Sequence, residues 1–322
     1  MIGQDRAAGR VVRRVVRRVV IVGDVGVDVA VRPAAPPCPG QDTPADIVVT
    51  PGGAGANLAA RLAGRGLDVT LIARVGSDHP AATARAELSA AGIDCRFTID
   101  EEQPTCTVVV LVGPDGERTM FSDRGAGAGL IPADLDLPGS ADPTHLHLSG
   151  YVLLDPRTRA AGLAALAAAR SRDWSTSLDP QSGPAPGAGP EPQEILRWCA
   201  GVDLLLPNEY ELDILGGPAA VTPVFGVVAV TRGAAGAAFL RGAERLDRPL
   251  PAQPHPAPSY GSGSGSGLGS GSGGLVDTTG AGDAFNAGFL AGWLAGAAPA
   301  DALQAGMAAG TAATRHPGGR PR

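Results

Sequence analysis

The sequence predicts an α/β fold in three layers: a doubly wound, mostly parallel β-sheet flanked by helices on both faces. Short β-rich runs alternate with stretches of helical periodicity along most of the 322 residues. Strands that alternate with helices form right-handed crossovers, which cover a parallel sheet on both faces. Hydrophobic residues make up 44% of the chain and charged residues 18%, so enough apolar side chains are present for a large core.

The expected elements follow one another along the chain. Short runs rich in β-branched or apolar residues, next to Gly, Pro or Asp, predict strands at residues 19–23, 69–75, 145–149, 175–179, 203–206, 227–231 and 237–240. Helical spacing of apolar or alanine residues predicts helices at 57–66, 81–91, 157–170, 194–200 and 209–215, and two more within 284–314. Gly66 and Gly92 close the first two helices, as glycine commonly does.

Two β-like segments interrupt this alternation. Residues 29–50 are proline-rich and then partly β-branched, and residues 94–122 contain a hairpin with strands at 106–112 and 117–121. Both segments follow an early strand–helix pair. We expect them to form a small β lid that stands off the main sheet.

The rest of the chain predicts one domain, over residues 19–319. Residues 1–18 carry a repeated Val-Val-Arg-Arg pattern that suits neither a strand nor a helix, and we expect an N-terminal extension. A basic segment lying on a membrane surface is the alternative. Residues 261–274 are Gly and Ser with one Leu, which predicts a flexible insertion rather than a functional glycine loop.

Charge and residue usage exclude several classes of function. The chain has 26 basic and 32 acidic residues and a net charge of −6, which argues against nucleic acid as a partner. All the basic residues are arginines. The absence of lysine excludes a Walker-type phosphate loop, a Schiff-base lysine and a pyridoxal-phosphate anchor.

Cysteine spacing and apolar runs predict a cytoplasmic protein. The four cysteines lie far apart without a Cys-x-x-Cys pair, which indicates free thiols in a reducing compartment. Arginines interrupt the apolar N-terminal stretch, unlike a signal peptide. The longest uncharged run, 284–300, is glycine-rich, and we expect a buried helix there rather than a membrane span.

The strongest chemical signal lies in residues 276–285. A strand-like end gives way to the small residues Gly280, Ala281 and Gly282, and an apolar helix begins near Asp283. Backbone N–H groups at a helix N-terminus bind anions, and glycine allows a phosphate to approach closely. A carboxylate at that place suits a base that takes a proton from a hydroxyl attacking phosphorus. A helix-capping aspartate is the alternative.

Two further clusters offer polar groups to a ligand. Gly52 and Gly53 open a helix that carries Asn57, which suits close approach of the backbone to a polar ligand or, alternatively, a glycine turn with an Asn cap. Asp24 and Asp28 follow the first strand, and ligands of open parallel sheets bind at the carboxyl ends of strands. An aspartate there can accept hydrogen bonds from two neighbouring hydroxyls; a turn aspartate is the alternative.

Two other pairs each allow two interpretations. Asn208 and Glu211 share a helix face after a strand, where they can hold hydrated Mg²⁺ beside phosphates or form a capping box. His145 and His147 alternate on a strand. Because no third ligand is near them in sequence, two hydrogen-bonded core histidines are favoured over a metal pair.

Together these motifs resemble the PfkB carbohydrate kinase family, whose fold is ribokinase-like. The Gly-Gly-Ala-Gly-Ala-Asn motif at 52–57 and the Asp-Thr-Thr-Gly-Ala-Gly-Asp motif at 277–283 stand in the family's order, and the resemblance covers about residues 19–319. It implies ATP-dependent phosphorylation of a hydroxyl of a small carbohydrate, with Mg²⁺. A nucleoside kinase of the same family and a non-catalytic small-molecule binder are the alternatives.

The resemblance also implies roles for individual residues. Asp283 would be the catalytic base, and the backbone of Gly280, Ala281 and Gly282 would form an anion hole for the transferring phosphate. Residues implied to bind substrate are Asp28, Gly52, Gly53, Asn57 and Arg124. Those implied on the nucleotide side are Asn208, Thr231 and Gly233. Those implied near metal ions are Glu211 for Mg²⁺, and Asp277 and Thr279 for a monovalent cation such as K⁺.

Departures from the family's pattern bear on the substrate. Ala54 stands where ribokinases and several phosphosugar kinases carry lysine, and Gly26 where ribokinases tend to carry a polar contact. An uncharged sugar is therefore favoured over a phosphorylated one, with Arg124 and then Arg118 as the candidates for a substrate phosphate. The connection over 217–227 is shorter than the family's, which usually has a further helix there. The family's lid often mediates dimers, which implies a homodimer through the lid.

Overall fold

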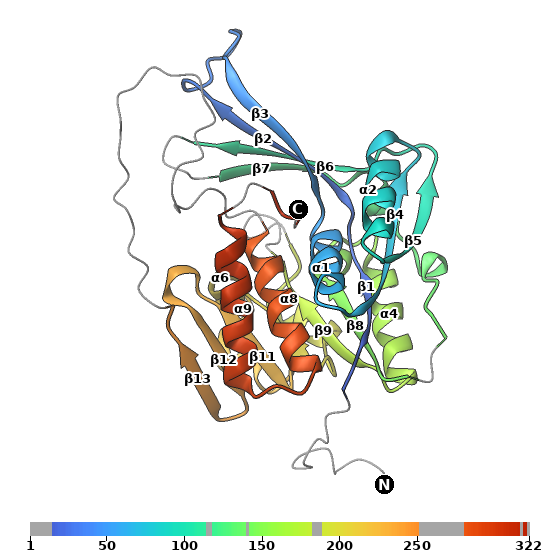
Figure 1. The fold of residues 1–322 in the computed structure, drawn as a ribbon, viewed down its shortest axis with the longest axis vertical. Coiled ribbons are helices and arrows are strands. Elements are labelled where there is room, and N and C mark those ends of the chain that lie inside the picture. Colours follow the sequence, from blue (N-terminus) through green and yellow to red (C-terminus); the bar gives the residue numbers. More distant parts are fainter. Residues whose placement is uncertain are drawn as a thin grey trace.

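The larger of two sheets forms the centre of the computed structural model, which describes residues 15–113, 118–139, 142–181, 189–250, 280–315 and 318–320. Nine strands of the described residues lie in the order β13-β12-β11-β10-β9-β8-β1-β4-β5 (Figure 1). Neighbours from β11 to β5 are parallel, whereas β12 and β13 pair antiparallel at one edge. Their bounds are β1 Arg18–Val22, β4 Asp68–Gly76, β5 Asp94–Asp100, β8 Thr144–Ser149, β9 Ser175–Asp179, β10 Leu204–Leu205, β11 Val227–Thr231, β12 Ala237–Arg241 and β13 Glu244–Arg248.

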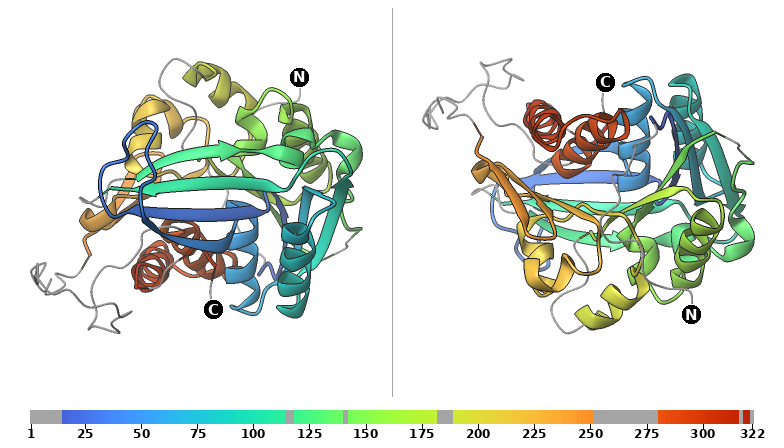
Figure 2. Two further views of the ribbon diagram at one scale, coloured as in Figure 1. Left: turned by 90° about the horizontal axis from the view of Figure 1, so that it is seen from above. Right: turned by 90° about the horizontal axis from the view of Figure 1, so that it is seen from below.

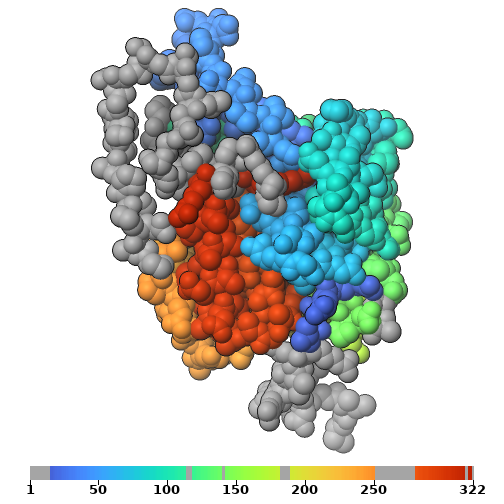
Figure 3. Space-filling model, viewed as in Figure 1, coloured from blue at the N-terminus to red at the C-terminus, as the bar shows by residue number. Residues whose placement is uncertain are grey.

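Helices cover both faces of this sheet, which confirms the predicted three-layer, doubly wound fold (Figure 2). One face carries α1 Ala54–Ala63, α2 His79–Ala90, α8 Ala281–Leu294 and α9 Pro299–Ala313, which lie side by side in Figure 3. The other face carries α3 Gly150–Leu154, α4 Arg159–Ser171, α5 Pro192–Trp198, α6 Glu209–Ile214 and α7 Pro218–Val221.

Strand β1 shows why a central strand of this sheet is mostly apolar. Successive side chains of a strand point to opposite faces of the sheet. Val19 and Ile21 therefore pack into the core beneath α1 and α8, while Val20 and Val22 pack into the core beneath α4. All four side chains are fully buried, as expected for a parallel sheet covered on both faces.

A four-stranded sheet stands over the carboxyl ends of the parallel strands (Figure 1). Its order is β3-β2-β6-β7, with bounds β2 Gly26–Pro33, β3 Ala45–Gly52, β6 Cys106–Val112 and β7 Arg118–Asp123. Strand β2 pairs antiparallel with β3 and parallel with β6, and β6 pairs antiparallel with β7. These strands are the predicted β lid.

The prediction that residues 94–122 all belong to the lid was wrong in its first part. Residues 94–100 form β5, which pairs in parallel with β4 from Thr70↔Asp94 to Gly76↔Asp100. Helix α2 connects β4 to β5, which pairs in parallel with the free edge of β4. The large sheet therefore gains one more strand before the chain enters the lid hairpin.

Other differences from the sequence prediction are local. Helix α1 begins at Ala54, three residues early, and the charged edge strand β13 was not predicted. The short helix α7 occupies the connection after Gly217. The uncharged run 284–300 is divided between α8 and α9, and no helix of the described residues is long and apolar enough to span a membrane. Residues 1–14 and the Gly/Ser segment 261–274 lie outside the described residues.

Candidate active site

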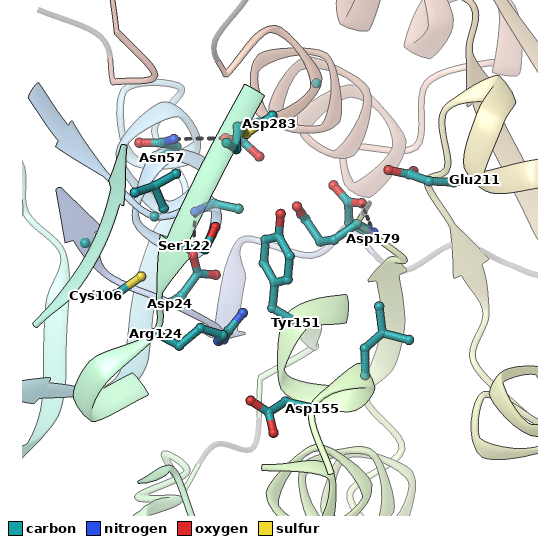
Figure 4. Close-up of a pocket in the computed structure, with 18 of the residues that line it drawn as sticks. Asp24, Asn57, Cys106, Ser122, Arg124, Tyr151, Asp155, Asp179, Glu211 and Asp283 are labelled. Carbon is teal, nitrogen blue, oxygen red and sulfur yellow. Dashed lines mark hydrogen bonds between the residues drawn. The ribbon is translucent and has the colours of Figure 1, made fainter. Parts of the chain in front are cut away.

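A cavity of about 1250 Å³ lies between the two sheets, at the carboxyl ends of the parallel strands. Asp24 enters it after β1, Tyr151 after β8, Asp179 at the end of β9, and Thr231 at the end of β11. The lid strands contribute Asp28, Cys106, Val108 and Ser122, and Arg124 follows β7. Helix α8 contributes Asp283, which Figure 4 labels, and Asn286. Ligands of open parallel sheets bind at this edge, so the sheet topology alone brings these polar groups together.

Asp283 lies in the first turn of α8, where its carboxylate lines the cavity. Its Oδ2 accepts a hydrogen bond of 2.9 Å from Asn57 Nδ2 of α1 (Figure 4). Burial raises the pKa of Asp283 to about 7; the negative charges of Asp24 and Asp28 act in the same direction, whereas the Asn57 hydrogen bond and the Arg61 cation lower it. A carboxylate with a pKa near 7 is suited to accept a proton at neutral pH.

The start of α8 has the form of an anion site. Gly280 is the N-cap residue with φ +70°, a left-handed conformation that favours glycine. The first amide groups of a helix have no partner within the helix and point along its axis. Gly280 and Gly282 line the cavity beside Asp283, while Ala281 does not. The predicted anion hole therefore adjoins the predicted base.

The sugar-binding residues predicted from the sequence gather at the junction of β2, β3 and α1. Asp28, Gly53 and Asn57 line the cavity, and Gly52 lies just behind Asp28, where any β-carbon would collide with the Asp28 carboxylate. Gly53 has φ +89°, and a β-carbon there would lie 2.7 Å from the Asp24 carbonyl oxygen. Glycine is thus required for this close approach of two backbone segments.

Asp24 has a structural task in addition to lining the cavity. Its Oδ2 accepts a 3.0 Å hydrogen bond from the Ala54 amide at the start of α1, and its Oδ1 accepts one of 3.2 Å from Ser149 Oγ. Both carboxylate oxygens are therefore used within the protein. Asp28 is the aspartate of this pair that stands on the lid and faces the ligand space.

Sequence reasoning missed the buried Asp179 as a site residue. Its Oδ2 accepts a 2.7 Å hydrogen bond from Asn286 Nδ2, and its Oδ1 accepts one of 2.9 Å from the Gln181 amide. Burial, together with the negative charges of Glu211 and Asp283, raises its pKa well above the usual value. The strand-end rule that singled out Asp24 applies equally to Asp179, and Asn286 follows Asp283 on the same face of α8.

Asn208 and Glu211 form the capping box that was one of their two predicted interpretations. Asn208 Oδ1 accepts from the Glu211 amide at 2.8 Å, and Glu211 Oε2 accepts from the Asn208 amide at 2.9 Å, which is a capping box. Both residues also line the cavity, as does Thr231. Gly233 starts a 3₁₀ turn outside the lining, and Asp277 and Thr279 lie outside the described residues.

The donors at this end of the cavity fit a hydrated Mg²⁺ that also binds nucleotide phosphates. Within the described parts of the chain, no group of three His, Cys, Asp or Glu side chains is placed to hold a metal ion. Glu211 supplies a carboxylate beside Asn208, and the Asp179 carboxylate lines the same cavity close enough to Glu211 to feel its charge. Mg²⁺ commonly takes one or two carboxylates and completes its shell with water and phosphate oxygens, so this donor set is sufficient.

Arg124 is one of the arginines that line the cavity, and Figure 4 draws it beside Tyr151. Its guanidinium carbon lies 4.9 Å from the centre of the Tyr151 ring, within cation–π distance. Its Nε is buried and has no hydrogen-bond partner among the described residues. Arg118, the second candidate for a substrate phosphate, also lines the cavity, and Ala54 places no charge there.

His145 and His147 are core residues, as the sequence favoured. His145 contacts Ser175 Oγ at 2.8 Å and Ser177 Oγ at 2.7 Å, and His147 contacts Ser177 Oγ at 2.8 Å. Burial lowers the pKa of both imidazoles to about 3, so both are neutral at physiological pH.

The fold and the cavity define a ribokinase-like phosphotransferase architecture, and comparison with known proteins identifies the family. The family model described as "pfkB family carbohydrate kinase" matches residues 16–267 and 268–321. The chain therefore belongs to the PfkB family of carbohydrate kinases.

Individual relatives agree with this assignment. A fructokinase of Klebsiella pneumoniae is 33% identical over 264 residues, covering 77% of this chain and 78% of the relative. An ATP-dependent ribose-1-phosphate kinase of Halopiger xanaduensis is 30% identical over 274 residues, covering 84% of this chain and 82% of the relative. The crystal structure of a Vibrio cholerae fructokinase with fructose, ADP and a calcium ion bound is 25% identical, with a TM-score of 0.74 over 95% of each chain.

Proposed function

We propose that this protein is an ATP-dependent kinase that phosphorylates a hydroxyl of a small uncharged sugar, with Asp283 as the general base. The observation that carries the proposal is the position of Asp283. Its half-buried carboxylate, with a pKa of about 7, stands at the N-terminus of α8 in the same cavity as Asp28 and Asn57. The fructokinase and ribose-1-phosphate kinase relatives support a sugar as the acceptor.

The proposed reaction is an in-line transfer. The sugar hydroxyl oxygen bonds to the γ-phosphorus of ATP as the bond from that phosphorus to the bridging oxygen breaks, and ADP leaves. Asp283 takes the hydroxyl proton, while the N–H groups around Gly280 and Gly282 stabilise the negative charge on the transferring group. Bound Mg²⁺ would neutralise phosphate charge, held through Glu211 beside Asn208 and Thr231.

The charges of the substrate end favour an uncharged sugar. Three carboxylates, those of Asp24, Asp28 and Asp283, line this part of the cavity, and Ala54 adds no cation. They repel a substrate phosphate, whereas Asp28 can accept hydrogen bonds from two sugar hydroxyls. Asn57 is a further polar contact. Arg124 remains the residue that would bind a phosphate if the substrate carries one.

We also propose that two copies of the chain pair through the lid. One row of paired residues crosses all four lid strands: Val49, Val29, Val109 and Phe121. The neighbouring row contains Asp28, Val108 and Ser122, which line the cavity. Because successive side chains of a strand point to opposite faces, the first row faces away from the cavity. Val49 is 63% exposed and Phe121 is 58% exposed. A second copy would bury this apolar face by packing the same row of side chains against it. Phe121→Asp should convert a dimer to a monomer in light-scattering measurements; a monomeric wild type would contradict the proposal.

The test of activity is a panel of sugars and nucleosides with ATP, read by coupled detection of ADP. We expect ADP release with at least one neutral sugar. A thermal-shift measurement with ATP distinguishes a kinase from a non-catalytic small-molecule binder. A binder without a nucleotide site would show no stabilisation by ATP and no turnover. Turnover with nucleosides alone would move the substrate class to nucleosides.

A further inference from the structure

A short C-terminal segment, residues 318–320, packs behind the proposed base and anion hole. We name it the strap. It lies beside α1, β3 and the start of α8, at the chain end marked in Figure 1. Gly318 and Gly319 are buried, and the Arg320 side chain is only 8% exposed. None of the three residues lines the cavity.

Two arginines hold the strap in place. Arg61 of α1 donates to the Gly319 carbonyl oxygen from both Nη2, at 2.7 Å, and Nε, at 3.2 Å. Arg320 donates from Nη2 to the Gly52 carbonyl oxygen at 2.9 Å and forms an ion pair with Glu87 of α2 at 3.3 Å. The strap is thus fixed to α1, to the end of β3 and to α2.

Gly319 packs between two groups that determine the position of Asp283, namely the Asn57 side chain and the N-terminus of α8. A β-carbon at Gly319 would collide with the side-chain amide of Asn57, the donor to Asp283. A β-carbon at Gly280, the N-cap of α8, would meet the Gly319 backbone. The two hydrogen bonds from Arg61 therefore hold Gly319 against the side chain of Asn57 and against Gly280, the first residue of the anion site.

We propose that Arg61 is a positioning residue: through the strap it fixes Asn57 and the N-terminus of α8, and so sets the orientation of Asp283. Arg61 does not line the cavity and touches neither reacting group. Catalysis depends steeply on such placement, since a displacement of about 1 Å can cost about 10²-fold in rate. This inference rests on the proposed function, because it assumes that Asp283 is the base.

The test compares Arg61→Met, Arg61→Lys and Arg65→Met. Arg61→Met keeps an aliphatic stem but removes both donors, and we expect kcat to fall about tenfold or more while KM for ATP changes little. KM for the sugar should rise, because Asn57 is also a proposed sugar contact. Arg61→Lys keeps one donor and a charge, and should recover part of kcat. Arg65 lies just beyond the end of α1, and its exposed guanidinium donates to the Arg61 carbonyl oxygen rather than to the strap, so Arg65→Met should retain wild-type kcat.

The pH profile of kcat distinguishes positioning from simple destabilisation. Around Asp283, the charged groups among the described residues are Asp24, Asp28, Asp179 and Arg61, and Asn57 adds a hydrogen bond. Loss of the Arg61 cation should move the acid limb of the profile to higher pH, which a fall in stability alone would not do. Gly319→Ala, which displaces Asn57 without changing charge, should lower kcat and leave KM for ATP nearly unchanged, while KM for the sugar should rise because Asn57 is also a proposed sugar contact.

The outcomes separate this inference from the proposed function. If Asp283→Asn keeps wild-type activity, the proposed base is wrong. If Asp283→Asn is inactive but Arg61→Met and Gly319→Ala keep wild-type kcat and an unmoved acid limb, the strap has only a structural role and the inference is overturned. If Arg61→Met does not fold, Gly319→Ala decides by the same criteria.

Discussion

The side-chain amide of Asn57 donates a 2.9 Å hydrogen bond to Asp283 Oδ2, joining α1 to α8 at the edge of the cavity. The two residues are 226 positions apart in sequence. The bond fixes one oxygen of the carboxylate and favours its ionised form, while burial opposes ionisation. The resulting pKa of about 7 leaves Asp283 able to take up a proton at neutral pH.

Asp283→Asn should lower kcat by about 10²–10⁴-fold, the usual contribution of a general base. Asparagine keeps the size of the side chain but cannot accept the hydroxyl proton. KM for the sugar should stay within a few-fold of wild type, and circular dichroism should show an unchanged fold. Steady-state kinetics check this, and a kcat within a factor of about two of wild type would remove Asp283 from the role.

The rate should also depend on the ionisation of Asp283. Because its pKa is about 7, protonation below that pH removes the base, so kcat should fall by about tenfold per pH unit on the acid side. The measurement is kcat against pH at saturating ATP and sugar. A kcat that stays flat from about pH 5 to pH 8 would show that the ionised carboxylate is not required.

The same pKa predicts a pH-dependent difference in stability. The pKa of Asp283 is raised by folding, so the folded protein binds more protons than the unfolded chain between its ordinary pKa of 3.8 and about 7. This contribution to stability is present at low pH and is lost as pH rises through about 7. Asp283→Asn should therefore have a Tm a few degrees above wild type at about pH 8.5, and the difference should disappear toward about pH 4. A constant difference would contradict the assigned pKa.

Asp28→Ala should reduce kcat/KM for the sugar by about 10²-fold or more, since two hydrogen bonds to a charged acceptor are each worth about 1.5–3 kcal/mol. Slow hydrolysis of ATP by water should persist, because Asp28 contacts the sugar rather than the phosphates. Asp46→Ala is the matched control: it lies on the same sheet but is exposed and outside the cavity lining. Equal losses in both variants would indicate a general effect on the lid.

Matched pairs such as fructose and fructose 6-phosphate test the substrate charge. We expect the neutral sugar to have the higher kcat/KM, because three carboxylates line the substrate end of the cavity. Arg124→Ala should affect both sugars to a similar extent. A preference of about tenfold or more for the phosphorylated sugar, lost in Arg124→Ala, would instead assign Arg124 to a substrate phosphate.

Local residue patterns were sufficient to predict most of the fold. The strands β1, β4 and β8 are central and buried on both faces, and such strands read as mostly apolar runs in the sequence. The motif at 280–283 could likewise be assigned to a helix start, because glycine before an apolar helix is a local signal. The same patterns misplaced residues 94–100, since membership of one sheet or the other depends on which strand edge is free.

Tertiary structure alone determined how the site residues interact. Asp24 and Asp28 stand four positions apart, yet one is held by the Ala54 amide and Ser149 while the other faces the cavity from the lid. Asp179 gains its raised pKa from burial and from carboxylates brought by other elements. Such desolvation and charge proximity are properties of three-dimensional packing, whereas helix starts and strand periodicity arise from neighbours along the chain.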